Sequence, residues 1–205
     1  DSAWIEIEEY AEKFETPMIY VGGESAGKIK TKDQMKHSAI CNQFYVYSGA
    51  ENMVNMMKYI CSQVLHEEMD YQEPIFIPWE GIFHPDSKEI FQSTKDYFAW
   101  KEPSGKGTIA LLVSRTAWLS GDIEVERALI KHIEKNGYTA LPIFSYAMAD
   151  IDLGAKGTAY AIETFCFDGY GQPIVDGVIR MTGFFLQDTD EYANTSESSV
   201  MSRLN

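Results

Sequence analysis

Residues 107–144 read GTIALLVSRTAWLSGDIEVERALIKHIEKNGYTALPIF, and this stretch decides the fold. Ile109–Val113 is an unbroken apolar run, which predicts a strand that is covered on both faces, as in a parallel sheet. Residues 114–121 are predicted to form a loop. Tyr138–Phe144 is a second apolar run of β-forming residues and predicts a second strand.

The segment between these two strands has the pattern of an amphipathic helix. It begins near Asp122 with acidic residues, which suit the positive end of a helix dipole, and Gly137 stands where a left-handed C-cap belongs. Its apolar side chains fall on one helical face: Val125, Ala128, Leu129 and Ile133. Strand, helix and strand over this length form a βαβ unit, whose crossover is right-handed in nearly all proteins.

The rest of the chain predicts further helices and strands around this unit. Residues 71–103 are rich in proline and aromatic side chains and predict an extended connector that ends in a short helix. The predicted helices are 1–14, 36–47, 51–65, 87–100 and 158–167, and the further strands are 18–21 and 174–181. We therefore predict an α/β protein with Rossmann-like or flavodoxin-like parallel sheets in two partial lobes. Residues 1–72 would be the end of a first α/β lobe and 73–205 a second α/β lobe with the connector at its start.

The predicted helix 51–65 carries a stripe rich in methionine. Its members recur at helical spacing: Met53, Met56, Met57, Ile60, Cys61 and Val64. Such a stripe favours ordinary core packing, and the alternative is an adaptable binding groove, because methionine fits irregular surfaces.

Composition excludes several classes of function. The formal net charge is −14, which excludes nonspecific nucleic-acid binding because that binding needs Lys and Arg. No apolar run reaches the length of a membrane span. Three cysteines without a CxxC pair predict free thiols, and we expect a cytoplasmic protein. Gly22 and Gly27-Lys28 have the spacing of a phosphate-binding loop, but Ile29 stands where a magnesium-binding hydroxyl is needed, so we expect no bound nucleotide.

Several short motifs, in this order, resemble the large subunit of the cobalt and magnesium chelatases. They are Ser48-Gly-Ala-Glu-Asn-Met, Gly81-Ile-Phe-His-Pro, Leu111-Leu-Val-Ser-Arg, Gly121-Asp, Leu141-Pro-Ile-Phe, Val175-Asp-Gly-Val-Ile and Thr182-Gly-Phe. The resemblance covers roughly residues 48–186. It implies a fragment from the amino-terminal side of a much longer subunit that holds a tetrapyrrole while a metal ion is inserted.

The resemblance also implies partners and a division of labour. A separate AAA+ ATPase subunit would use ATP and magnesium, a third subunit would couple it to the large one, and a cobalt or magnesium ion would be a substrate. We expect no cofactor on this chain and no catalytic residue in it, because the residues that insert the metal lie downstream in the family.

Four residues are candidates for contact with the tetrapyrrole. Arg115 follows a predicted strand and suits a clamp on the acidic or amide arms of the ring, with a structural ion pair as the alternative. His84 suits a base or a ring contact, and the alternative is that its imidazole fixes the connector. Thr182 and Gly183 follow the strand predicted at 174–181, where α/β sheets usually meet ligands, although Gly183 is most simply a tight turn.

Two other functions remain open at this stage. One is a non-catalytic α/β module that binds a small ligand. The other is a scaffold that docks partner proteins, for which the aromatic connector would offer an apolar surface.

Overall fold

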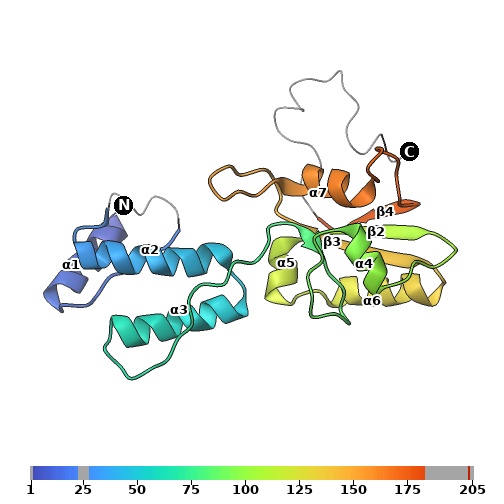
Figure 1. The fold of residues 1–205 in the computed structure, drawn as a ribbon. Helices are drawn as coiled ribbons and strands as arrows, with labels where there is room; N and C mark the ends of the chain where they lie inside the picture. The colour runs from blue at the N-terminus through green and yellow to red at the C-terminus, as the bar shows by residue number, and fades with distance from the viewer. Residues whose placement is uncertain (1, 23–27, 183–202, 204–205) are drawn as a thin grey trace, which may run out of the picture. The chain divides into compact units, whose positions relative to one another are not determined.

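The computed structural model describes residues 2–22, 28–182 and 203, and the chain forms two compact units, Asp1–Ile77 and Pro78–Asn205 (Figure 1). The division falls in the proline- and aromatic-rich stretch, within which the sequence placed a boundary near residue 73.

Within residues 2–22 and 28–77, the first unit contains three helices: α1 (Ser2–Lys13), α2 (Lys32–Tyr47) and α3 (Ala50–Gln63). The strand predicted at 18–21 is wrong, because that segment forms no ladder with any other described segment of the chain. Side chains of α2 bind its backbone instead: the Tyr20 amide donates to Ser38 Oγ at 3.0 Å, and the Gly22 amide donates to Asn42 Oδ1 at 2.9 Å.

The core of this unit is small and aromatic. Cys41, Phe44 and Tyr59 are its fully buried members, and the ring of Tyr71 packs edge-on against Tyr59 with centroids 5.2 Å apart. Burial raises the pKa of the Tyr59 hydroxyl to about 12.

The buried residues of α3 are Asn52, Asn55 and Tyr59, and none of them belongs to the predicted methionine stripe. Asn52 and Asn55 are buried, while Met57 is 57% exposed. The reason is that the following segment runs beside the helix, and the two asparagine amides bind its backbone at Gln72 and Ile75. The predicted core role therefore holds for part of the stripe only, with Met56 and Ile60 against the aromatic core.

The second unit is a mixed sheet between helices. Its strands are β1 (Gly81–Ile82), β2 (Thr108–Ser114), β3 (Thr139–Ser145) and β4 (Gly177–Arg180), in the order β1-β3-β2-β4. Strands β2, β3 and β4 are parallel, and short β1 pairs antiparallel with β3. The predicted α/β fold and the βαβ unit at 107–144 are confirmed, and β1 makes the sheet mixed rather than wholly parallel.

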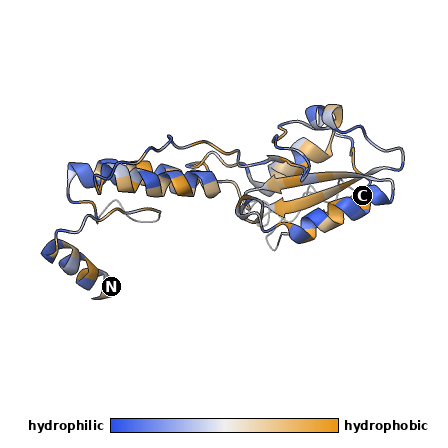
Figure 2. Cartoon of the chain, turned by 90° about the horizontal axis from the view of Figure 1, so that it is seen from below, coloured by the Kyte–Doolittle hydropathy of each residue, from blue (hydrophilic) through white to orange (hydrophobic). Residues whose placement is uncertain are grey.

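Helices cover both faces of this sheet, as Figures 1 and 2 show. Alternate strand residues enter two cores: Ala110 and Leu112 pack with α7 (Gly157–Cys166), and Leu111 and Val113 pack with α6 (Glu124–Lys135). Because both faces are covered, β2 and β3 are apolar between their terminal Thr and Ser residues, and this part of the sheet is hydrophobic in Figure 2.

Two predicted boundaries were wrong for reasons of packing. The loop predicted at 114–121 contains α5 (Arg115–Ser120), whose Trp118 stacks on Phe144 at a centroid distance of 3.9 Å. The helix predicted at 87–100 forms only from Thr94 to Trp100, as α4. Its first half is extended instead, because Phe91 pairs with Ile82 of β1.

Candidate ligand site at the carboxyl edge of the sheet

The three parallel strands end at one edge of the sheet, and the residues that follow them meet there. Arg115 follows β2, Tyr146 follows β3, and Thr182 lies two residues after β4. Ligands of open α/β sheets bind outside the carboxyl ends of the strands, so this edge is the candidate site.

Arg115 is held against the segment that precedes β1. Its side chain is buried, its Nε–H donates to the Pro78 carbonyl at 2.9 Å, and its guanidinium carbon lies 4.2 Å from the centre of the Trp79 ring. Burial lowers the pKa of Arg115 to about 10, so the guanidinium is still charged at neutral pH. The site therefore contains a buried cation stacked on an aromatic ring, a geometry that suits recognition of a carboxylate.

Glu80 places a buried carboxylate beside this cation. The residue is 8% exposed, and its Oε1 accepts hydrogen bonds from the amides of Lys156 at 2.9 Å and Gly157 at 2.7 Å. These amides lie at the amino terminus of α7, where the helix dipole favours negative charge. Burial still raises the pKa of Glu80, although those two hydrogen bonds, Lys156 and Arg115 all favour its charged form.

Sequence reasoning missed Glu80, although a signal was present. In the run IFIPWEGIF, Glu80 is the one charged residue among apolar and aromatic side chains. A lone acid in such a run is either exposed by a turn or buried with partners, and buried acids need hydrogen bonds and a counter-charge. The partner amides lie 76 and 77 residues downstream, so the sequence pattern does not reveal them.

Hydroxyl groups line the same edge. Ser145 Oγ lies 2.8 Å from Thr158 Oγ1, and both residues are buried. The Met181 amide donates to the Leu112 carbonyl at 2.9 Å, which extends the β2–β4 ladder to the residue before Thr182. Thr182 is 8% exposed, and its hydroxyl is buried with no hydrogen-bond partner within residues 2–22, 28–182 and 203. Gly183, the fourth candidate, lies outside the described residues.

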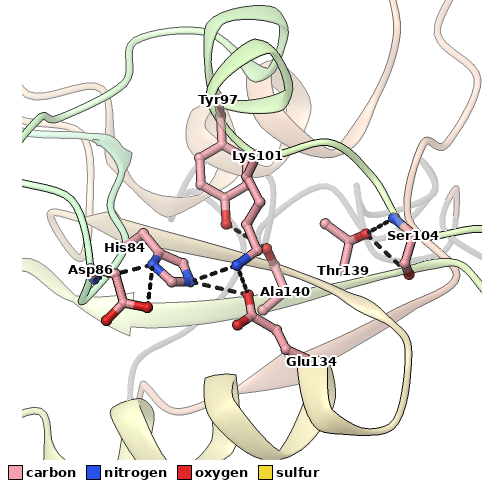
Figure 3. Close-up of polar contacts among 8 residues, drawn as sticks. All are labelled: His84, Asp86, Tyr97, Lys101, Ser104, Glu134, Thr139 and Ala140. Carbon is pink, nitrogen blue, oxygen red and sulfur yellow. Dashed lines mark hydrogen bonds and ion pairs between the residues drawn. The ribbon is translucent and has the colours of Figure 1, made fainter.

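His84 belongs to a different cluster, shown in Figure 3. Since β1 runs antiparallel to β3, the chain leaves β1 toward the amino end of β3. There the Tyr97 hydroxyl, whose ring packs beside His84, donates to the Ala140 carbonyl at 2.7 Å. Ala140 is five residues before Ser145, about 16 Å along a strand. The structure thus brings Arg115 and Thr182 to one edge and places His84 toward the other.

The His84 cluster joins three segments of the chain. The Asp86 amide donates to His84 Nδ1 at 3.2 Å, so the ring hydrogen is on Nε2 and points to Glu134 Oε1 at 3.1 Å (Figure 3). In this tautomer the 3.4 Å approach of Lys101 Nζ to Nε2 is a contact, and Lys101 pairs with Glu134.

The protonation of His84 follows from its surroundings. Burial lowers the pKa of His84, the Lys101 charge acts in the same direction, and Glu134 and Asp86 oppose them. A neutral, enclosed imidazole with both nitrogens engaged favours the structural interpretation that the sequence left open. Contact with a tetrapyrrole stays a prediction for this residue.

Two kinds of feature are absent from the described residues. Within the described part of the chain, no group of three or more His, Cys, Asp or Glu side chains has the arrangement of a metal site. None of the helices in that part is both long and apolar enough to span a bilayer.

Comparison with known proteins decides the family. The model of the CobN/magnesium chelatase family matches residues 42–205, well over half of the chain. The chain belongs to this family. The resemblance to the chelatase large subunit that the sequence motifs indicated is thereby confirmed.

Individual relatives agree with the family match. The chain is 27% identical to an uncharacterized protein of Methanocaldococcus jannaschii over 75% of its own length and 12% of the relative. It is 27% identical to a magnesium-chelatase subunit of Chlorobaculum parvum over 77% of the chain and 12% of that relative. It is 24% identical to the chloroplastic magnesium-chelatase subunit ChlH of Oryza sativa over 70% of the chain and 11% of that relative.

The chain spans only about an eighth of the length of these relatives. Among solved structures it is similar to the catalytic subunit of cobaltochelatase from Mycobacterium tuberculosis. That similarity has a TM-score of 0.46 and 18% identity, and it covers 71% of this chain and 10% of the other.

Proposed function

We propose that this chain is part of the large, tetrapyrrole-holding subunit of an ATP-dependent chelatase that inserts cobalt or magnesium into a corrin or porphyrin ring. Membership of the chelatase family supports this proposal. The single structural observation that carries it is Arg115, a buried cation stacked on Trp79 at the carboxyl edge of the sheet.

In this proposal, Arg115 and Thr182 hold the tetrapyrrole and do not insert the metal ion. Insertion removes two pyrrole N–H protons and transfers a divalent ion from water, which calls for a base and for carboxylate or imidazole ligands to the ion. We place those groups in other parts of the subunit. Arg115 supplies what holding requires, because a guanidinium binds carboxylates in a fixed two-point geometry. Thr182 contributes a hydroxyl at the same edge.

The assembly follows from the same proposal. A separate AAA+ subunit uses ATP and magnesium, a third subunit couples it to the large one, and the cobalt or magnesium ion is a substrate. This chain binds no cofactor of its own in that scheme. We expect the assembly to be cytoplasmic.

Partner docking is a second candidate, and α1 favours it. Four large apolar side chains of the helix and one directly after it are each 49–62% exposed. The four are Trp4, Ile5, Ile7 and Tyr10, and the fifth is Phe14. An exposed group of this size is typical of interaction surfaces. Co-purification of an AAA+ subunit with the chain, lost on changing Trp4 and Phe14 to serine, would support docking.

The experiment that tests the main proposal is an absorption titration of the chain with three macrocycles: hydrogenobyrinic acid diamide, sirohydrochlorin and protoporphyrin IX. We expect saturable binding to one of them. Arg115→Gln should weaken binding by about tenfold or more, since a hydrogen bond to a charged group contributes about 1.5–3 kcal/mol. Lys101→Gln, in the distant His84 cluster, is the matched control and should bind as the unchanged chain does. Absence of saturable binding to all three would refute the proposal.

A further inference from the structure

The amino terminus of α7 already binds an anion, and that anion is the chain's own side chain. Both amides there, on Lys156 and Gly157, donate to the same oxygen of Glu80. Gly157 has a φ of +81°, and an added Cβ would lie 2.7 Å from the backbone of Met148 and Ala149. The turn into the helix is therefore tightly built around these two amides, with glycine required at its centre.

Thr182 is an independent sign of a ligand at this edge of the sheet. Met181 packs in the core on the α6 side of the sheet, whereas Val178 packs against the core on the α7 side. Side chains alternate along an extended strand, so Thr182 points to the α7 side. Its buried hydroxyl has no hydrogen-bond partner in the described part of the chain, and such groups are rare unless something binds them.

Two neighbouring hydroxyls lie on the same side of the sheet as Thr182. Leu141 and Ile143 of β3 belong to the core on the α7 side, and Ser145 is the next residue in that alternation. Its hydroxyl meets that of Thr158, in the first turn of α7. The Thr158 hydroxyl donates to the carbonyls of Tyr146 at 3.1 Å or Ala147 at 3.2 Å, so this pair of hydroxyls is internally bonded. Two helix amides, the Thr182 hydroxyl and the charge of Arg115 belong to the same end of the sheet, and this is the chemistry that binds a carboxylate.

We infer that this end of α7 is a carboxylate-exchange site, in which Glu80 holds the place that a carboxylate arm of the ligand takes. The ligand class rests on the proposed function, since corrin and porphyrin precursors carry carboxylate side chains. Exchange replaces one carboxylate by another on the same two amides and leaves the number of hydrogen bonds unchanged. It also moves the buried charge of Glu80 to water, where a carboxylate is well solvated.

The first test uses acetate as the probe and needs no macrocycle. Glu80→Ala removes the carboxylate and leaves the Lys156 and Gly157 amides without their acceptor, so thermal stability should fall. Sodium acetate should restore the melting temperature saturably, whereas sodium chloride at equal ionic strength should not. Glu80→Gln keeps an oxygen acceptor in place and is the matched control, which acetate should not stabilise. No saturable response of Glu80→Ala, or an equal response to chloride, would overturn the inference.

A double variant examines Thr182 in the same assay. Thr182→Val has the same shape without the hydroxyl. In the Glu80→Ala background it should weaken the apparent acetate affinity by about tenfold, as expected for one lost hydrogen bond to a charged group. An unchanged acetate affinity would remove Thr182 from the site.

The second test identifies the source of the carboxylate. Protoporphyrin IX with free acids is compared with its dimethyl ester, on the unchanged chain and on Glu80→Ala. Without the competing side chain, the free acid should bind at least about threefold tighter, and the ester should show no gain. An equal gain for acid and ester, or none for the acid, would overturn exchange with the macrocycle.

The two tests separate this inference from the proposed function. If acetate rescues Glu80→Ala but no macrocycle binds any form of the chain, the carboxylate site stands and the proposed function falls. If a macrocycle binds the chain but acetate never rescues Glu80→Ala, the proposed function stands and the exchange site falls.

Discussion

Replacement of Asn52 should destabilise the first unit strongly. Asn52 is 1% exposed. Its Oδ1 accepts from the Ile75 amide at 2.9 Å, and its Nδ2 donates to the carbonyls of Ile75 and Ser48, each at 2.8 Å. One side chain thus binds both backbone groups of a residue 23 positions away and fixes the segment beside α3.

The cost of Asn52→Ala follows from these three hydrogen bonds. A neutral hydrogen bond contributes about 0.5–1.5 kcal/mol net, so their loss should cost about 2–4 kcal/mol. Since small domains are stable by only about 5–15 kcal/mol, this is a large fraction of the stability of a unit of this size. Gln63→Ala, at the exposed end of the same helix, is the control and should cost less than about 0.5 kcal/mol.

Urea unfolding followed by two probes measures the effect. Far-UV circular dichroism reports the helices of both units, whereas three of the four tryptophans lie in the second unit: Trp79, Trp100 and Trp118. We expect the first unit to unfold at a lower urea concentration than the second and to give its own dichroism transition. With a dependence of the unfolding free energy on urea of about 1 kcal/mol/M, Asn52→Ala should lower the midpoint of that transition by about 2 M or more. The midpoint of the tryptophan transition should not change. A dichroism shift below about 0.5 M, or an equal shift of both probes, would refute the reasoning.

Three further predictions concern the other described features. Burial lowers the pKa of His84 below 6.5. The stability that the neutral imidazole contributes is therefore present above pH 6.5 and is lost as the pH falls. Between about pH 7 and pH 5, the melting temperature should decline less in His84→Gln than in the unchanged chain. Burial raises the pKa of the Cys41 and Cys166 thiols to about 11 and about 12, so titration of the folded chain with a thiol reagent should modify one of the three cysteines rapidly and these two only after unfolding. Gly157→Ala combines a positive φ with a backbone clash and should lower the melting temperature more than Gly121→Ala, whose added Cβ meets open space; equal losses would contradict the clash.

The βαβ unit was predictable because its signals are local. Continuous apolar runs identify β2 and β3, and the spacing of apolar residues identifies α6 between them. The C-terminal end of α6 is equally local, since Gly137 has a φ of +84° there. Arg115 and Thr182 were found as site candidates because each follows a strand of this kind.

The features that the sequence concealed all depend on distant partners. The direction of β1 is set by its antiparallel pairing with β3. A parallel β1 would lead His84 to the candidate edge, whereas the observed direction leads it toward the amino end of β3. The helix α5 depends on Trp118 stacking against Phe144 of β3. The sequence around Trp79–Glu80 predicts a surface connector. In the folded chain, this segment instead contacts the amides of α7 and the guanidinium of Arg115.

The segment Pro78–Glu80 links the candidate site to the rest of the chain. Arg115 binds the Pro78 carbonyl, the Tyr146 amide binds the Trp79 carbonyl at 3.1 Å, and α7 binds the Glu80 carboxylate. All three anchors come from the carboxyl edge of the sheet, and the segment begins where the first unit ends. A ligand that displaces Glu80, as we infer, would remove the α7 hydrogen bonds and leave the other anchors of this segment, which include the bond from Gln92 Nε2 to the Glu80 carbonyl at 3.3 Å. If the inferred exchange occurs, ligand binding and the restraint of Pro78–Glu80 share one carboxylate, and a change in either alters the other.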